Sequence, residues 1–134
     1  MSKQTSKWGS EKILIADDDQ YSYMFLEKVF KKTGAEIVYA PNGKVAMEKL
    51  MTDASISIAI LDILMPQMTG IEVLEKVKSY RNDVIFIAYT ADVIRINKDE
   101  CLKIGFHACI QKPTLPVKIL AIMEEILFFW KQEH

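Results

Sequence analysis

The sequence predicts one α/β domain, a doubly wound sheet of five parallel strands with five helices on its two faces. Short apolar segments rich in β-branched residues alternate with longer segments of helical spacing, and the connections are short. Apolar residues are consecutive within the short segments, which is typical of parallel strands covered on both faces. Right-handed crossovers then place helices on both sides of an open sheet. A chain of 134 residues can bury such a core without disulfides.

Five segments are expected to be strands, and they are residues 13–16, 36–40, 56–61, 84–89 and 108–110. The first helix between them ends near Gly34, the second follows the turn at 41–43, and the third separates apolar from charged residues. The fourth, residues 92–104, is the least regular. The fifth begins at Thr114, a suitable N-cap, and runs to Trp130. The apolar positions of the first three helices are Phe25, Leu26, Val29, Phe30, Val45, Ala46, Leu50, Ile71, Leu74 and Val77.

The ends of the chain are polar. Residues 1–11 are expected to be a linker or a disordered lead, in which Trp8 is a candidate to pack on the domain, and residues 131–134 a tail. The domain would then span residues 12–130. With no apolar segment of membrane-spanning length and no signal core, we expect a cytoplasmic domain without membrane contact. A net charge of −1 gives no field that attracts nucleic acid, and the two cysteines are expected to be free thiols.

Reactive side chains follow four of the five predicted strands. Asp17, Asp18 and Asp19 follow the first strand, and Asp62 follows the third. Thr90 follows the fourth strand and Lys112 the fifth. In open α/β sheets, ligands bind at the carboxyl ends of the strands, so we expect these residues to form one site.

Converging carboxylates repel one another by on the order of 1 kcal/mol or more per pair near a protein surface, and a divalent cation removes that penalty. Oxygen ligands with some remaining water suit Mg²⁺ or Mn²⁺. A carboxylate can also attack a phosphoryl group, in which case Lys112 and Thr90 would supply a positive charge and a hydrogen-bond donor. By themselves, Asp17 and Asp18 could equally cap a helix. Asp19 is expected to start the first helix, because two acids from this loop suffice.

Four motifs in this order carry a family resemblance, and they are ILIADD, LDILMPQMTG, YTA and QKP. From Lys12 to Trp130 the chain resembles the receiver domain of two-component response regulators, including the receivers of hybrid sensor histidine kinases. The resemblance implies a flavodoxin-like strand order of 2-1-3-4-5. It also implies phosphorylation of Asp62 by a histidine kinase or a histidine phosphotransfer protein, in a phosphorelay. The domain would transfer the phosphoryl group to itself and turn over no free substrate.

The resemblance also implies the metal ligands. Asp18 and Asp62 would bind Mg²⁺ directly, Asp17 would act through metal-bound water, and the backbone carbonyl of Leu64 would complete the protein ligands.

Further residues take their roles from the same resemblance. Thr90 and Lys112 would each contact a phosphoryl oxygen. Pro66 and Gly70 would shape the loop after the phosphoacceptor, and the bond between Lys112 and Pro113 would be cis.

Three positions depart from the family pattern or tune it. Cys109 stands where many receivers have an aromatic residue that moves inward on activation, so that the usual aromatic readout is in doubt. Leu64 and Asp92 occupy positions that border the route of attacking water and help to set the lifetime of the phosphoryl group.

The last predicted helix is more apolar than packing on one sheet face requires. Its apolar residues spread over an arc of about 180°, where about 100° is usual. They are Ile119, Leu120, Ile122, Met123, Ile126, Leu127, Phe129 and Trp130. Such excess suggests an interface. We expect this helix, with the fourth helix and the fifth strand, to dock a kinase, a partner domain or a second copy; packing against Trp8 is the alternative.

A second hypothesis is a haloacid-dehalogenase-like phosphatase with Asp17 as nucleophile. Asp17-Asp18-Asp19 contains an Asp-x-Asp at the end of the first strand, where such enzymes place their nucleophile and acid. The motif LDILMP would then have no role, and the chain is short for such a fold with its cap. The sequence leaves open whether the domain acts alone or belongs to a hybrid kinase.

Overall fold

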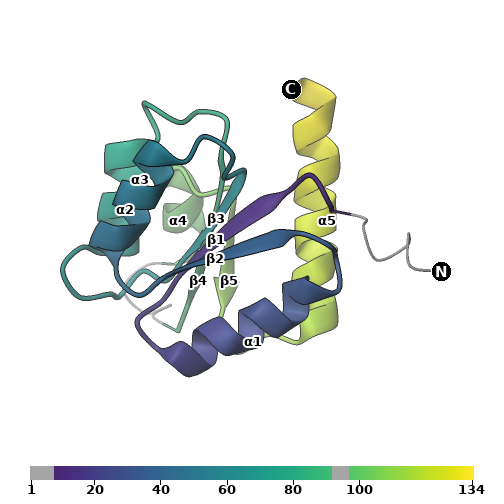
Figure 1. Cartoon of the computed structure of the whole chain (residues 1–134), viewed down its shortest axis with the longest axis horizontal. Helices are drawn as coiled ribbons and strands as arrows, with labels where there is room; N and C mark the ends of the chain where they lie inside the picture. Colours follow the sequence, from purple (N-terminus) through teal and green to yellow (C-terminus); the bar gives the residue numbers. More distant parts are fainter. Residues whose placement is uncertain (1–7, 92–96) are drawn as a thin grey trace.

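The computed structural model describes residues 8–91 and 97–134, and it has five strands and five helices in alternation (Figure 1). The strands are β1 (Lys12–Ala16), β2 (Glu36–Ala40), β3 (Ile58–Leu61), β4 (Ile85–Thr90) and β5 (Ala108–Gln111). The helices are α1 (Gln20–Lys31), α2 (Gly43–Thr52), α3 (Gly70–Val77), α4 (Lys98–Ile104) and α5 (Pro116–Glu133). The sheet order is β2-β1-β3-β4-β5 and every pair is parallel, which confirms the predicted fold.

The sheet separates two apolar cores. Helices α2, α3 and α4 cover one face, and α1 and α5 cover the other (Figure 1). In β1, Leu14 packs into the first core while Ile13 and Ile15 pack into the second, and all three are fully buried. Successive side chains of a strand point to opposite faces, so a strand covered on both faces needs apolar residues at consecutive positions.

Helix α4 is shorter than predicted. It begins at Lys98, because the Asn97 side chain accepts the backbone N–H of Glu100, and the Glu100 carboxylate in turn accepts the N–H of Asn97. This reciprocal capping fixes the start of a helix. The sequence analysis placed Asn97 inside the helix. The earlier part of that prediction, including Asp92, lies outside the described residues.

Both ends of α5 also differ from the prediction. Thr114 does not cap the helix, since its hydroxyl donates to the carbonyl of Gln111, and the N-cap is Leu115 without a side-chain bond. Pro116 opens the helix; its fixed φ suits that position and it has no N–H that needs a cap. The helix continues to Glu133, so nearly all of the expected tail is helical.

Trp8 packs on the domain. Its side chain is buried, its ring lies 5.8 Å from that of Phe30, and its backbone N–H donates to the carbonyl of Thr33 at 2.8 Å. Glu11 is buried as well and accepts the Ser57 hydroxyl at 2.8 Å. Residues 8–11, which the sequence analysis placed in the lead, are therefore part of the packed structure. Residues 1–7 lie outside the described part of the chain.

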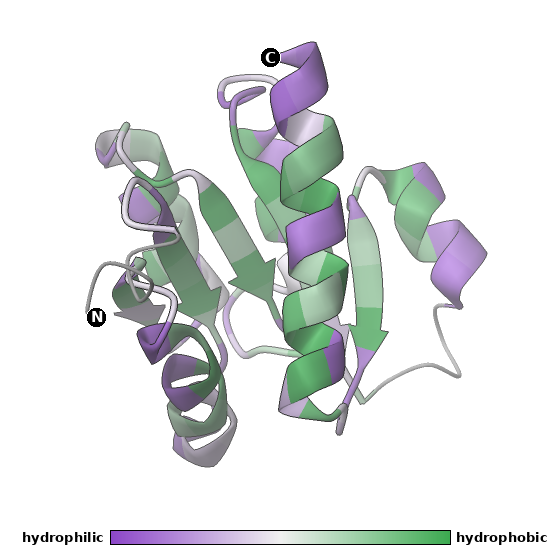
Figure 2. Ribbon diagram, turned by 90° about the vertical axis from the view of Figure 1, so that its right-hand side faces the viewer, coloured by the Kyte–Doolittle hydropathy of each residue, from purple (hydrophilic) through white to green (hydrophobic). Residues whose placement is uncertain are grey.

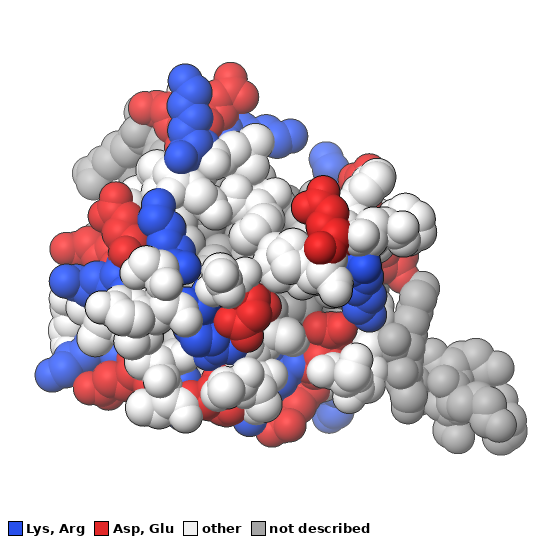
Figure 3. Space-filling model, turned by 90° about the horizontal axis from the view of Figure 1, so that it is seen from above, with Lys and Arg blue, Asp and Glu red and all other residues white. Residues whose placement is uncertain are grey.

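The surface mixes charges of both signs. On the face shown in Figure 3, acidic and basic side chains are interspersed among uncharged ones. None of the helices among residues 8–91 and 97–134 is long and apolar enough to cross a bilayer.

Candidate functional site

The register of the sheet brings the predicted acids together. Ala16 pairs with Leu61, so that Asp17 and Asp62 leave adjacent strands at the same level. The backbone N–H of Asp62 donates to the carbonyl of Ala16 at 3.0 Å, which continues the ladder for one more residue. One carboxylate oxygen from each of Asp17, Asp18 and Asp62 lies within 4.8 Å of the other two. Asp17 and Asp62 are buried, whereas Asp18 is exposed.

Lys112 lies between the two buried carboxylates. Its Nζ is 2.7 Å from Oδ2 of Asp17 and 3.3 Å from Oδ2 of Asp62. Its backbone N–H donates to the carbonyl of Thr90 at 2.9 Å, and the bond to Pro113 is cis, as predicted. The ammonium group therefore occupies the place where the sequence analysis expected charge neutralisation, although it pairs here with the carboxylates themselves.

The pKa values of this cluster show how the charges compete. Burial raises the pKa of Asp62, the charge of Lys112 opposes that rise, Asp17 adds to it, and the Thr90 hydroxyl stabilises the carboxylate by a hydrogen bond. For Lys112, burial lowers the pKa, but the hydrogen bond to Asp17 and the charges of Asp62 and Asp17 outweigh it and raise the pKa overall. The lysine therefore stays charged, and the site still carries more negative than positive charge.

Asp19 has a different role from its neighbours, as the sequence analysis expected. Its side chain accepts the N–H of Tyr21 at 2.9 Å and caps α1. Its own backbone N–H donates to Oδ1 of Asp17 at 2.9 Å, which helps to orient that carboxylate toward the site.

Tyr39 makes a hydrogen bond near the site that the sequence analysis did not predict. Its hydroxyl donates to the backbone carbonyl of Asp17 at 2.9 Å, and its ring lies 4.1 Å from the ring of Tyr23. The tyrosine thus ties the edge strand β2 to the loop that carries the acids. Nothing in the segment EIVYA distinguishes this tyrosine from a residue that only packs, because the contact depends on the strand register.

The loop after Asp62 is held by close backbone packing. The N–H of Gly70 donates to the carbonyl of Ile63 at 3.0 Å, and a Cβ on Gly70 would lie only 2.4 Å from the carbonyl oxygen of Asp62. Gln67 has a positive φ of 71°, and the N–H of Met68 donates to the carbonyl of Pro66 at 2.8 Å. The absence of a side chain at Gly70 therefore lets α3 begin directly against the backbone of Asp62.

Cys109 lies beside Cys101 between β5 and α4. Cys101 is fully buried and Cys109 partly buried, and both are free thiols. Burial raises the pKa of the Cys101 thiol, and its hydrogen bond with Cys109 adds to the rise. The position that many receivers give to a mobile ring is thus occupied by a small side chain packed against the core.

The donor set fits a hard divalent cation. It consists of carboxylate oxygens alone, two of them buried and one open to solvent, which suits Mg²⁺ or Mn²⁺ better than zinc. Leu64 is on the same loop, with a side chain that is 47% exposed.

Known proteins share this sequence pattern and architecture. A family model described as response regulator receiver domain matches residues 13–124. The response regulator SaeR of Staphylococcus aureus is 28% identical over 122 residues, which cover 91% of this chain and 53% of that protein. The chain thus spans about half the length of the curated relatives it matches.

Solved structures of response regulator proteins have the same fold as this chain. The crystal structure of a CheY-like receiver domain protein from Methanospirillum hungatei has a TM-score of 0.85 at 28% identity, covering 92% of this chain and 98% of that one. The crystal structure of a CheX–CheY–BeF3–Mg²⁺ complex from Borrelia burgdorferi has a TM-score of 0.82 at 28% identity, covering 87% and 89%.

Proposed function

The chain belongs to the response regulator receiver domain family of two-component signal transduction, and from this premise we propose that it accepts a phosphoryl group on Asp62 in a Mg²⁺-dependent reaction. The observation that carries the proposal is the convergence of Asp17, Asp18 and Asp62 around the ammonium group of Lys112.

Asp62 is the proposed nucleophile. One of its carboxylate oxygens forms a bond to phosphorus as the bond between phosphorus and the donor imidazole nitrogen breaks, and the electron pair of the broken bond remains on that nitrogen. Lys112 is within reach of both buried carboxylates and can turn toward a phosphoryl oxygen. The Thr90 hydroxyl, already bonded to Asp62, can donate to another.

The proposed metal ligands are the three carboxylates of this cluster and one backbone carbonyl. Asp18 and Asp62 would bind Mg²⁺ directly, Asp17 would act through a bound water, and the carbonyl of Leu64 would complete the set. When bound, the ion supplies positive charge that neutralises the phosphoryl oxygens. The Borrelia relative was crystallised with Mg²⁺ and BeF3, which supports this assignment.

A histidine kinase or a histidine phosphotransfer protein is the proposed donor, which would place the domain in the cytoplasm. Two exposed apolar side chains close to site residues in the chain offer such a protein a contact surface: Tyr21, two residues after Asp19, is 82% exposed, and Leu115, three residues after Lys112, is 72% exposed. The phosphorylated domain would act through α4, β5 and α5 on a partner domain or a second copy, without turnover of a free substrate. No contact with nucleic acid or membrane is proposed.

The phosphatase hypothesis has no support in the site. Both carboxylate oxygens of Asp17 are already engaged, Oδ1 by the N–H of Asp19 and Oδ2 by Lys112. The matching family model describes a receiver domain and lends the phosphatase hypothesis no weight.

Intact-mass measurement after incubation with acetyl phosphate and Mg²⁺ tests the proposal. We expect a hydroxylamine-labile gain of one phosphoryl group, which is lost in Asp62→Asn and when the metal is chelated. Asp19→Asn is the matched control and should retain the gain, because Asp19 caps a helix. A modification that persists in Asp62→Asn and maps to Asp17 would contradict the proposal and restore the phosphatase hypothesis.

A further inference from the structure

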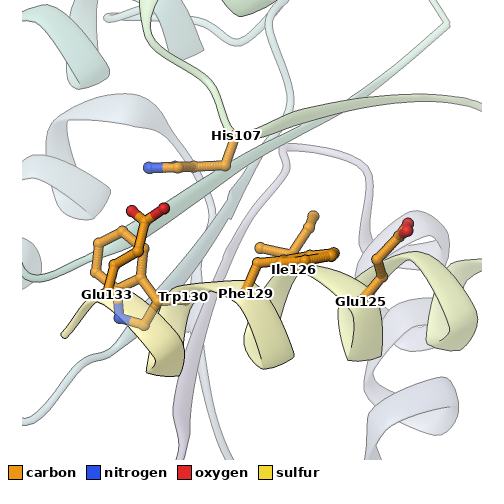
Figure 4. Close-up of a pocket in the computed structure, with 6 residues that line it drawn as sticks. All are labelled: His107, Glu125, Ile126, Phe129, Trp130 and Glu133. Atoms are coloured by element: carbon orange, nitrogen blue, oxygen red, sulfur yellow. The ribbon is translucent and has the colours of Figure 1, made fainter.

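A groove lies at the amino end of β5, at the opposite end of this strand from Lys112 (Figure 4). It has a volume of about 310 Å³ and runs between the residue before β5 and the C-terminal half of α5. Its lining residues are His107, Glu125, Ile126, Phe129, Trp130 and Glu133. Figure 2 shows α5 in front, with hydrophobic and hydrophilic segments alternating along its length.

The spacing on α5 orders these side chains into stripes. Glu125, Phe129 and Glu133 are four residues apart, so they lie one above the other on the helix surface in the order acid, aromatic, acid. Ile126 and Trp130 form the neighbouring stripe. Phe129 is 58% exposed, which is unusual for a phenylalanine in a domain with a well-filled core.

Ring contacts join the residues in the apolar part of the groove. The Trp130 ring meets the His107 ring edge-on at 5.3 Å, and His134 stacks on Trp130 at 3.9 Å. The Nδ1 atom of His107 accepts the backbone N–H of Phe86 at 3.0 Å, which requires that this nitrogen be unprotonated. The His107 side chain that lines the groove is therefore neutral and adds no positive charge to it.

The two glutamates carry uncompensated charge. Within residues 8–91 and 97–134, neither the Glu125 side chain nor the Glu133 side chain has a hydrogen bond or an ion pair, and both residues are exposed. On the same helix, Lys131 is already paired with Glu11 at 3.4 Å. Two exposed carboxylates thus flank the exposed ring of Phe129 (Figure 4).

The arrangement of the two glutamates and Phe129 indicates which side chains a bound partner must carry. The glutamates are eight residues apart, or about 12 Å along the helix axis. A helix lying along α5 matches that distance with two Lys or Arg residues eight positions apart and an apolar residue midway. Nucleic acid would be repelled, and a two-fold contact between copies through this stripe would oppose glutamates to glutamates.

We propose that this groove docks a basic amphipathic helix of a partner protein, whose two cations pair with Glu125 and Glu133 around an apolar side chain on Phe129. The proposal deepens the partner-binding role proposed above for α5, and it is independent of phosphorylation. Binding would combine burial of an exposed apolar stripe with charge complementarity, which sets partner choice and orientation.

The test uses the whole chain and a synthetic alanine-based helix with two lysines eight positions apart and a leucine midway, with a control peptide that has glutamates in place of the lysines. Titration by NMR should shift the amide signals of His107 and Phe129 and the indole signal of Trp130. The double variant Glu125→Lys with Glu133→Lys should weaken binding of the lysine peptide about tenfold or more, because it replaces two attractive charge pairs with two repulsive ones.

Two variants serve as controls. Glu75→Lys makes one such charge reversal on α3, across the sheet, and should bind the peptide as the parent does. Asp62→Asn should also bind normally, so a failure of the phosphorylation proposal leaves this one standing. Equal binding of the acidic peptide, or signals that shift only elsewhere, would overturn the proposal. A concentration-dependent dimer that the double variant abolishes would also overturn it, because the occupant would then be a second copy.

Discussion

The two ends of β5 lie beside two groups of acidic side chains with opposite surroundings. At the carboxyl end, Asp17 and Asp62 are 1% and 8% exposed and share the ammonium group of Lys112. At the amino end, Glu125 and Glu133 are exposed and have no partner among the residues that the structure describes.

This difference in burial has a chemical consequence. A buried carboxylate is costly unless a cation stays beside it, so the first group keeps a lysine and still has capacity for a metal ion. An exposed carboxylate costs little, because water solvates it, and it remains available to a cation on another molecule. The first group is built for chemistry within the domain, and the second for recognition at its surface.

Lys112→Met should have the largest effect, because it lowers the free energy of unfolding at the buried group of acids. It leaves two buried carboxylates without their cation, and loss of one partner of a buried pair typically costs about 3–5 kcal/mol. Urea unfolding in metal-free buffer measures the loss, and added Mg²⁺ should recover part of it. The matched control is Lys118→Met on α5, whose side chain is exposed and has no ion pair among the residues that the structure describes; it should change the free energy of unfolding by less than about 1 kcal/mol. Equal effects of the two variants would refute the distinction.

Gly70→Ala should have the next largest effect, again at the buried group. At an open helix position the change from glycine to alanine usually stabilises by up to about 1 kcal/mol. Here the new Cβ would lie 2.4 Å from the carbonyl oxygen of Asp62, so we expect destabilisation of about 1–3 kcal/mol and slower phosphorylation. Urea unfolding measures the change in the free energy of unfolding, and its sign shows whether this position is open or tightly packed. A more stable variant would contradict the packing described for this loop.

The smallest expected effect concerns His107, beside the exposed group. Partial burial lowers the pKa of the ring below its ordinary value of 6.5, so the unfolded chain binds a proton more readily than the folded one. Stability is then complete above about pH 6.5 and falls as the pH drops below that value, until the folded histidine titrates too. Because much of the residue is exposed, we expect only a few tenths of a kcal/mol.

Urea unfolding between about pH 7.5 and pH 5 measures this effect. Subtracting the His107→Gln curve from that of the parent isolates it from other titrating groups. The same pH dependence of stability in the parent and in His107→Gln would argue against a specific role for His107.

Much of the site could be predicted because it depends on local order along the chain. Each of Asp17, Asp62, Thr90 and Lys112 stands at or directly after the end of an apolar segment, and parallel strands bring such ends to one edge. The role of Asp19 as a helix cap was predictable for the same reason, since capping involves only the next few residues. The predicted start of α5 at Thr114 was wrong because a cap and a turn use the same hydroxyl, and its immediate neighbours decide between them.

By itself, the sequence determined the alternation of strands and helices, the parallel arrangement of the strands and the residues that gather at the carboxyl edge of the sheet. These features depend on the hydrophobic period of each segment and on the residues at the strand ends, which are local properties of the chain. Tertiary structure alone decided that Lys112 pairs with Asp17, that Tyr39 holds the acidic loop, that Trp8 is buried, and that two glutamates flank an exposed ring. These features depend on register and on distances of a few ångströms between segments far apart in the chain, and charge and hydrogen-bond energies change steeply over such distances.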